Sequence, residues 1–193
     1  MKSNTEQKTI RISMLFHPGT HDMVAFDMAW GGTHHPDIPI YLGANTGHGK
    51  KGHPRLERDQ QNKAAFLLRH FFPEKVKGQF LSTPTVEHSM VEGALEVIVR
   101  FPAGSQEESG RIWWMFDRAP DGSPQYLSEP IPDDNFVEMR HDPRRGVWVA
   151  EIELDPKAHR IDFFSNHRKT VRYAGNTYAT YLSCPYTRVE LGK

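Results

Sequence analysis

The sequence has little cysteine, no net charge and no long hydrophobic run. A single cysteine among 193 residues, Cys184, excludes an internal disulfide framework and a cysteine-based zinc cluster, and we expect it to be a small buried residue. Lysine plus arginine (24) equals aspartate plus glutamate (24), so no overall field attracts nucleic acid or an anionic membrane. Charges interrupt the apolar runs well short of the roughly 20 residues that a membrane-spanning helix requires. We therefore expect neither nucleic acid nor a membrane as partner.

The first eleven residues are polar and lack the apolar stretch of a secretory signal. These residues therefore carry no recognisable targeting signal, and the sequence does not indicate a cellular compartment. The overall composition, 37% hydrophobic and 25% charged, is that of a globular protein with room for one large or two small domains.

In the first half, two short apolar runs alternate with helical patterns. Residues 12–17 and 38–44 are typical of buried strands, because each run ends at a turn signal, Pro18-Gly19 and Asn45-Thr46-Gly47 respectively. Residues 56–72 carry apolar side chains at helical spacing, and Pro73 ends the pattern. The order of strand, short helix, strand and longer helix predicts parallel pairing. Two strands make no stable sheet alone, so we expect residues 1–75 to be a piece of a larger α/β sheet.

The second half has a different pattern. Five β-rich runs, separated by loops rich in Gly, Pro, Asp and Ser, occupy residues 94–101, 111–116, 147–154, 160–165 and 178–182. Within residues 147–154 one face is apolar and the other becomes charged. These features predict an antiparallel β-sandwich over residues 80–193, separated from residues 1–75 by a linker around 74–79.

Polar residues that could carry chemistry follow the two predicted strands of the first half. Asp22 comes shortly after the first strand, and His48 comes shortly after the second. Loops at the carboxyl ends of parallel strands share one edge of a sheet, where ligands bind. We therefore expect Asp22 and His48 to be neighbours.

These residues resemble a known family. The string GTHDMV around Asp22 is similar to the turn that bears the triad acid of α/β-hydrolases, and NTGHG around His48 is similar to the loop that bears the triad histidine. The helix over residues 57–72 resembles the terminal helix of that fold, and the acid precedes the histidine as in the family. The trailing sandwich narrows the resemblance towards esterase- and peptidase-like members, including the PhoPQ-activated pathogenicity-related proteins. The resemblance implies the C-terminal piece of an α/β-hydrolase, and the complete enzyme would act without a cofactor on a small ester or peptide substrate.

The sequence departs from that family at the nucleophile. No G-x-S-x-G turn occurs anywhere, and Ser105 and Ser183 follow the acid and histidine instead of preceding them. Without a nucleophile, His48 has no hydroxyl to deprotonate and Asp22 only orients the imidazole, so we expect the isolated chain to be inactive. Asp27 is the competing acid, although its position favours the start of a short helix.

Two other functions compete with the triad. One is metal binding by the histidines of the first half and a carboxylate, although no compact ligand motif connects them: His17, His21, Asp22, His34, His35, His48 and His53. The other is a carbohydrate-binding or structural module whose sugar platform would use aromatic side chains of the second half: Trp113, Trp114, Trp148, Phe163 and Phe164. Alternate positions of a sandwich strand point inward, so about half of these rings must be core, which favours the structural module.

Overall fold

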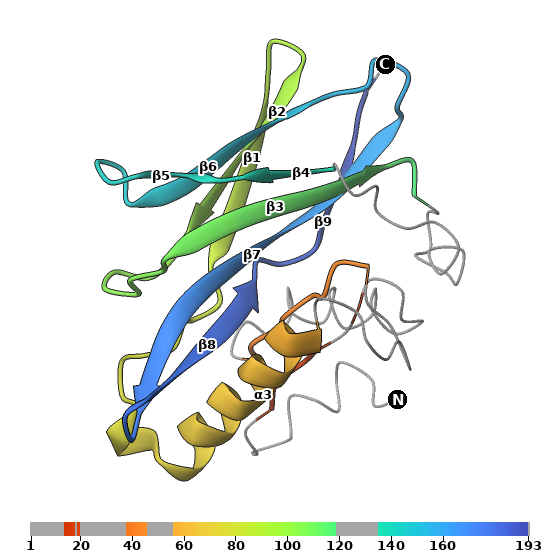
Figure 1. The fold of residues 1–193 in the computed structure, drawn as a ribbon. Coiled ribbons are helices and arrows are strands. Elements are labelled where there is room, and N and C mark those ends of the chain that lie inside the picture. The colour runs from red at the N-terminus through yellow and green to blue at the C-terminus, as the bar shows by residue number, and fades with distance from the viewer. Residues whose placement is uncertain (1–13, 18, 20–37, 46–55, 119–134, 193) are drawn as a thin grey trace.

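The computed structural model describes residues 14–17, 19, 38–45, 56–118 and 135–192. Within them, two antiparallel β-sheets lie beside a single α-helix, α3 (Leu56–Phe71), which is followed by the 3-10 turn η1 (Pro73–Lys75) (Figure 1). The strands in chain order are β1 (Thr85–Val91), β2 (Ala94–Arg100), β3 (Ser109–Phe116), β4 (Phe136–Glu138), β5 (Arg140–Asp142), β6 (Val147–Glu153), β7 (Arg160–Tyr173), β8 (Asn176–Ser183) and β9 (Thr187–Glu190).

The first sheet has the order β1-β2-β6-β5. The second sheet has the order β4-β3-β7-β8, and β9 also pairs with β7. Two-residue turns connect β1 to β2 and β7 to β8. Their central residues all have positive φ, 43° and 85° at Glu92-Gly93 and 49° and 78° at Ala174-Gly175, which is the pattern of the type I′ hairpin.

Strand β7 organises the second sheet. Along one edge it pairs with β3, and along the other its first residues pair with β9 and its later residues with β8. Between β8 and β9 the chain bulges at residues 184–186, where three residues oppose two of β7. The Ser165 N–H donates to Cys184 Sγ (3.1 Å), and the Cys184 N–H donates to the Ser165 carbonyl (3.1 Å), so the bulge leaves these groups satisfied.

The main core lies between the two sheets. In β6 the side chains of Trp148, Ala150 and Ile152 enter this core, as the alternation predicted. Val147 and Val149 are also buried, in a small cluster with Ile98 on the other face of the first sheet. An antiparallel sandwich in the second half is therefore confirmed, although β1, β4, β5, β9 and the second half of β7 were not predicted.

Helix α3 packs on the β7–β8 hairpin (Figure 1). Its Ala65 lies in a second cluster with Val76 and with Val171 of β7. By strand alternation Val171 points to the same face of β7 as His167, whose ring contacts Trp148 of the first sheet. The helix thus covers a continuation of the face that the first sheet covers.

The α/β-hydrolase sheet predicted for residues 1–75 is wrong. Among the described residues the backbones of the first segment (14–17 and 19) and the second segment (38–45) pair only at two isolated parallel bridges, Phe16 to Ile40 and Gly19 to Gly43. All of the named strands pair antiparallel. The fold is therefore mostly antiparallel β with one helix, and no parallel sheet is present in the part of the chain that is described.

The physical reason is that the second segment packs against the antiparallel sheet and does not need a parallel sheet to bury its apolar side chains. The Ser183 N–H of β8 donates to the Ile40 carbonyl (2.8 Å), and Ile40 and Leu42 are buried in the main core. A short apolar run needs cover for its side chains and partners for its backbone, and an existing antiparallel sheet supplies both. Apolar periodicity alone cannot distinguish this docking from membership in a parallel sheet.

Candidate functional site

Most of the residues predicted to carry chemistry lie outside the described residues. This set holds the triad acid and histidine, the competing acid and most of the histidines considered as metal ligands: Asp22, His48, Asp27, His21, His34, His35 and His53. The proximity of Asp22 and His48 therefore stays a prediction. Among the described residues, no three His, Cys, Asp or Glu side chains gather as a metal site would require.

His17 is the member of that histidine group that the structure places. Its Nε2 lies 3.6 Å from Asp59 Oδ1 of α3, and its ring lies 4.9 Å from the ring of Tyr41. Burial, aided by the charge of Lys63, lowers the pKa of His17 to about 4, and burial raises the pKa of Asp59. Because the imidazole is neutral at pH 7, this contact is no salt bridge there, and neither facing atom has a hydrogen-bond partner among the described residues.

The free edge of β8 is bonded at three successive alternate residues. The Ala179 N–H donates to Gln61 Oε1 (3.0 Å), the Tyr181 N–H to Asn62 Oδ1 (2.9 Å) and the Ser183 N–H to the Ile40 carbonyl (2.8 Å). An open strand edge invites pairing with other chains, and here two helix side chains and the second segment occupy it. We call this meeting of α3, the two segments and β8 the junction.

Ser183, one of the two serines considered above, is a structural residue of the junction. Its hydroxyl accepts a hydrogen bond from the Leu42 N–H (2.8 Å) and donates one to Asn166 Oδ1 (2.5 Å). The Asn166 amide in turn donates to the Leu42 carbonyl (3.1 Å). Ser105, the other serine, donates to the Pro102 carbonyl (2.6 Å). Among the described residues, neither hydroxyl is hydrogen-bonded to a histidine.

A cleft opens beside the junction, with about 310 Å³ of space including its mouth. Helix α3, the stretch after η1, strand β8 and both segments contribute its walls: Asn62, Phe66, Arg69, Phe80, Leu81, Thr180, Tyr181, Leu182, Leu15 and Pro39. Most of these side chains are apolar or aromatic, and few polar groups interrupt them. Apolar walls with a few polar groups are the composition of small-molecule sites, and much of the 310 Å³ here is open space at the mouth.

Two side chains give the cleft its polar character. Asn62 is 2% exposed, and its Oδ1 accepts hydrogen bonds from the Tyr181 N–H and the Thr180 hydroxyl, whereas its Nδ2 has no partner among the described residues. The bond from the backbone N–H fixes which amide atom is the oxygen. The guanidinium of Arg69 lies 5.4 Å from the centroid of the Phe80 ring. An amide donor without a partner in a buried position is rare, because its desolvation is not compensated.

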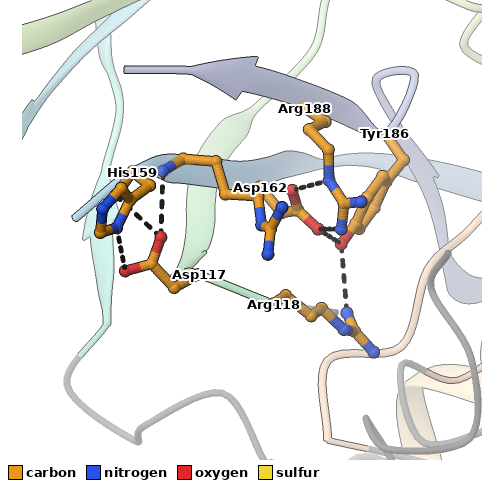
Figure 2. Close-up of polar contacts among 7 residues, drawn as sticks. Asp117, Arg118, His159, Asp162, Tyr186 and Arg188 are labelled. Atoms are coloured by element: carbon orange, nitrogen blue, oxygen red, sulfur yellow. Dashed lines mark hydrogen bonds and ion pairs between the residues drawn. The ribbon is translucent and has the colours of Figure 1, made fainter. Parts of the chain in front are cut away.

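A separate polar cluster lies at β9 and the end of β3 (Figure 2). Asp162, 2% exposed, accepts two hydrogen bonds from Arg188 (2.6 Å each) and one from the Tyr186 hydroxyl (2.5 Å). The Arg118 guanidinium donates to that hydroxyl (3.2 Å). Burial and the neighbouring Asp162 raise the pKa of Tyr186, which stays neutral. The carboxylate is fully used in fixing β9 to β7, as in a structural ion pair.

Asp117 lies at the edge of the same view (Figure 2). Its carboxylate accepts hydrogen bonds from the N–H groups of His159 (2.8 Å) and Arg160 (3.1 Å), and these bonds lower its pKa. The His159 ring nitrogen is 3.8 Å away and largely exposed. An aspartate in a turn commonly accepts hydrogen bonds from nearby backbone amides, so we interpret the Asp117–His159 pair as structural too.

A serine and a histidine do meet inside the sandwich. Ser165 Oγ and His167 Nε2 are 2.9 Å apart, and both residues are 0% exposed. Burial lowers the pKa of His167 to about 3. A Cβ placed on Gly110 would lie 2.8 Å from the His167 ring, which shows how closely the site is packed. A substrate has no way to this hydroxyl, so the pair is part of the core despite its catalytic-looking spacing.

Cys184 and the aromatic rings also belong to the interior. Burial raises the pKa of the Cys184 thiol to about 11, as expected for an unreactive buried residue. Four of the five rings considered as a sugar platform are at most 8% exposed: Trp113, Trp148, Phe163 and Phe164. These rings therefore pack the core, and they offer no surface platform.

Sequence reasoning missed Asp59 and Asn62. Both lie in the polar front half of a helix, where they resemble solvent-exposed residues. The sequence gives one weak signal for Asn62, because asparagine disfavours helix interiors and usually occurs there for a specific structural reason.

No helix of the described part is long and apolar enough to span a bilayer. No family model matches the chain, and no curated protein matches it.

Proposed function

We propose that this chain is a small-molecule binding module and that the cleft between α3 and β8 is its binding site. The observation that carries the proposal is the unpartnered Nδ2 of Asn62, a buried donor in a mostly apolar cleft. A bound acceptor atom compensates such a donor, and apolar walls supply the rest of the binding free energy.

The cleft is built on fixed elements. Asn62 and Gln61 are bonded to the backbone of β8, and Leu15 and Pro39 belong to segments that the Phe16–Pro39 and Ser183–Ile40 hydrogen bonds attach to the same strand. A site held by such bonds changes little when it is occupied, so binding costs little ordering entropy.

The other polar clusters are weaker candidates. The Asp162 carboxylate already accepts three hydrogen bonds, and the Ser165–His167 pair is sealed beneath the Trp148 and Phe101 rings. His167 Nδ1 also lacks a partner, but it lies in the packed core, whereas a binding site needs unused capacity in a place that a ligand can reach.

The experiment uses 8-anilinonaphthalene-1-sulfonate, a fluorescent probe with apolar rings and one acceptor group. Phe66 lines the cleft, whereas Phe71 is on the same helix, 65% exposed and outside the cleft. We expect Phe66→Ala to weaken probe binding at least fivefold, because a wall of the site is removed. The matched variant Phe71→Ala should bind the probe as the unmodified chain does. Loss of binding in Phe71→Ala with full binding in Phe66→Ala would place the probe on the exposed helix surface and refute the proposal.

A second proposal concerns Asp22 and His48 as an acid–base pair for ester or peptide hydrolysis that other sequence completes. It is supported by the Gly19–Gly43 bridge, because Asp22 follows Gly19 by three residues and His48 follows Gly43 by five. At roughly 3.5 Å per residue, both side chains can reach one place.

Titration by nuclear magnetic resonance tests this pair without requiring activity. A carboxylate bonded to an imidazole raises its pKa, so Asp22→Asn should lower the pKa of His48 by about one unit. Asp27→Asn is the control for the competing acid. If neither substitution moves the pKa of His48, the pair does not exist.

A further inference from the structure

We propose that the ligand of the cleft is a small carboxylate: an anionic head held at Asn62 and Arg69, and an apolar body, flat or short-chained, held between Phe66 and Phe80. This inference rests on the proposed function, because it names the class of molecule that the same site takes.

The polar groups of the cleft favour a negative head. Asn62 offers only a donor, since its oxygen is occupied by the Tyr181 N–H and the Thr180 hydroxyl. Arg69 adds a positive charge and forms no ion pair with a described acid. None of the ten lining residues is acidic. Two kinds of donor without a competing carboxylate match an acceptor-only group such as a carboxylate.

The apolar walls define the rest of the molecule. Phe66 and Phe80 line the cleft from α3 and from the stretch after η1, and Leu182 lines it from β8. Its 310 Å³ include the open mouth, so the enclosed part is much smaller, and at most one ring or a short chain could enter it. The Arg69 guanidinium over the Phe80 ring is already positioned towards the aromatic wall.

Arg69 is exposed, so its contribution is moderate and sensitive to salt. We expect the anionic head to improve affinity about tenfold over a neutral head of the same shape, the effect of one charge-assisted hydrogen bond. In 0.5 M salt this preference should shrink to about threefold or less.

Three probes of one shape test the charge preference: phenylacetate, phenylacetamide and 2-phenylethylammonium. Each is titrated into the full chain at low salt by calorimetry and by displacement of the fluorescent sulfonate. Phenylacetate should bind about tenfold more tightly than phenylacetamide, and the cation should bind most weakly. Arg69→Gln should remove most of the difference between phenylacetate and phenylacetamide. Arg58→Gln, the same change on the same helix outside the cleft lining, should preserve the difference.

The outcomes separate this inference from the proposed function. Equal affinities for the three probes, still sensitive to Phe66→Ala, would overturn the carboxylate inference and leave the cleft as a binding site. Tightest binding of the cation would also overturn it. If no probe binds and the fluorescent sulfonate ignores Phe66→Ala, both proposals fall.

Discussion

The sandwich interior buries one histidine fully and the junction buries another in part, and the two sites differ in what surrounds the imidazole. His167 bonds to Ser165 through Nε2 and packs on the rings of Phe101 and Trp148, while its Nδ1 lies in the closed core without a partner. His17 faces Asp59 across 3.6 Å with no hydrogen bond, next to a cleft in which another polar atom also lacks a partner. Both have a lowered pKa because burial disfavours the charged imidazole. A perturbed pKa therefore does not distinguish the two sites, and the proposed binding site rests instead on unused hydrogen-bonding capacity beside open space.

The largest effect is expected in the sandwich interior. Phe163 is 0% exposed and lies in the main core, so Phe163→Ala should lower the free energy of unfolding by about 3–5 kcal/mol. Phe71→Ala, which removes an exposed ring, should change it by less than about 0.5 kcal/mol. Urea unfolding followed by tryptophan fluorescence measures both. Similar losses in the two variants would mean that the core is not where the stability resides.

At the junction we expect a smaller loss. Asn62→Ala leaves the Tyr181 N–H without its acceptor and should cost about 1–3 kcal/mol in the same urea experiment. Gln60→Ala, one position outside the contact and exposed, is the control and should be near neutral. If Asn62→Ala were also neutral, the amide would not be capping the edge of β8.

The sequence predicted these two regions unequally. Alternation in residues 147–154 was enough to place β6, because a strand in a sandwich has one apolar face wherever its neighbours come from. The second half of β7 was missed, since Asn166, Arg168 and Thr170 look like loop residues until β3 and β8 supply backbone partners. The roles of Asp59 and Asn62 depend on segments far away along the chain, and no local pattern contains that information.

The first half shows the same limit. The helix was predicted correctly, because its apolar spacing and the proline that ends it, Pro73, are local features of the sequence. The two apolar runs were correctly expected to pair in parallel, but they form two bridges at the edge of an antiparallel sheet and build no parallel sheet. The apolar pattern predicted that the two runs would be buried. Where they are buried depended on β8, which lies far away along the chain.

Acidification should destabilise both regions through their two histidines of lowered pKa. The folded pKa values of about 4 for His17 and about 3 for His167 lie below the value of 6.5 for the unfolded chain, so the unfolded state binds more protons between these limits. The free energy of unfolding should therefore fall as pH drops below about 6.5, by at most about 1.4 kcal/mol per pH unit for each histidine.

Variants separate the two histidines. His167→Gln, which keeps a partner for Ser165, should flatten the dependence of stability on pH between 6.5 and 4, and His17→Gln should flatten it further. Urea midpoints across this pH range give the slopes. If both variants leave the pH dependence of the free energy of unfolding unchanged, carboxylates and not these histidines cause it.

The most direct test of the binding site is a titration of the isotope-labelled chain with phenylacetate, followed by amide chemical shifts. The account predicts the largest shifts at Asn62, Phe66, Leu81 and Tyr181, and a shift of the Asn62 side-chain amide as its Nδ2 gains a partner. Shifts gathered at the exposed Leu67 and Phe71, or no shifts at millimolar phenylacetate, would contradict it.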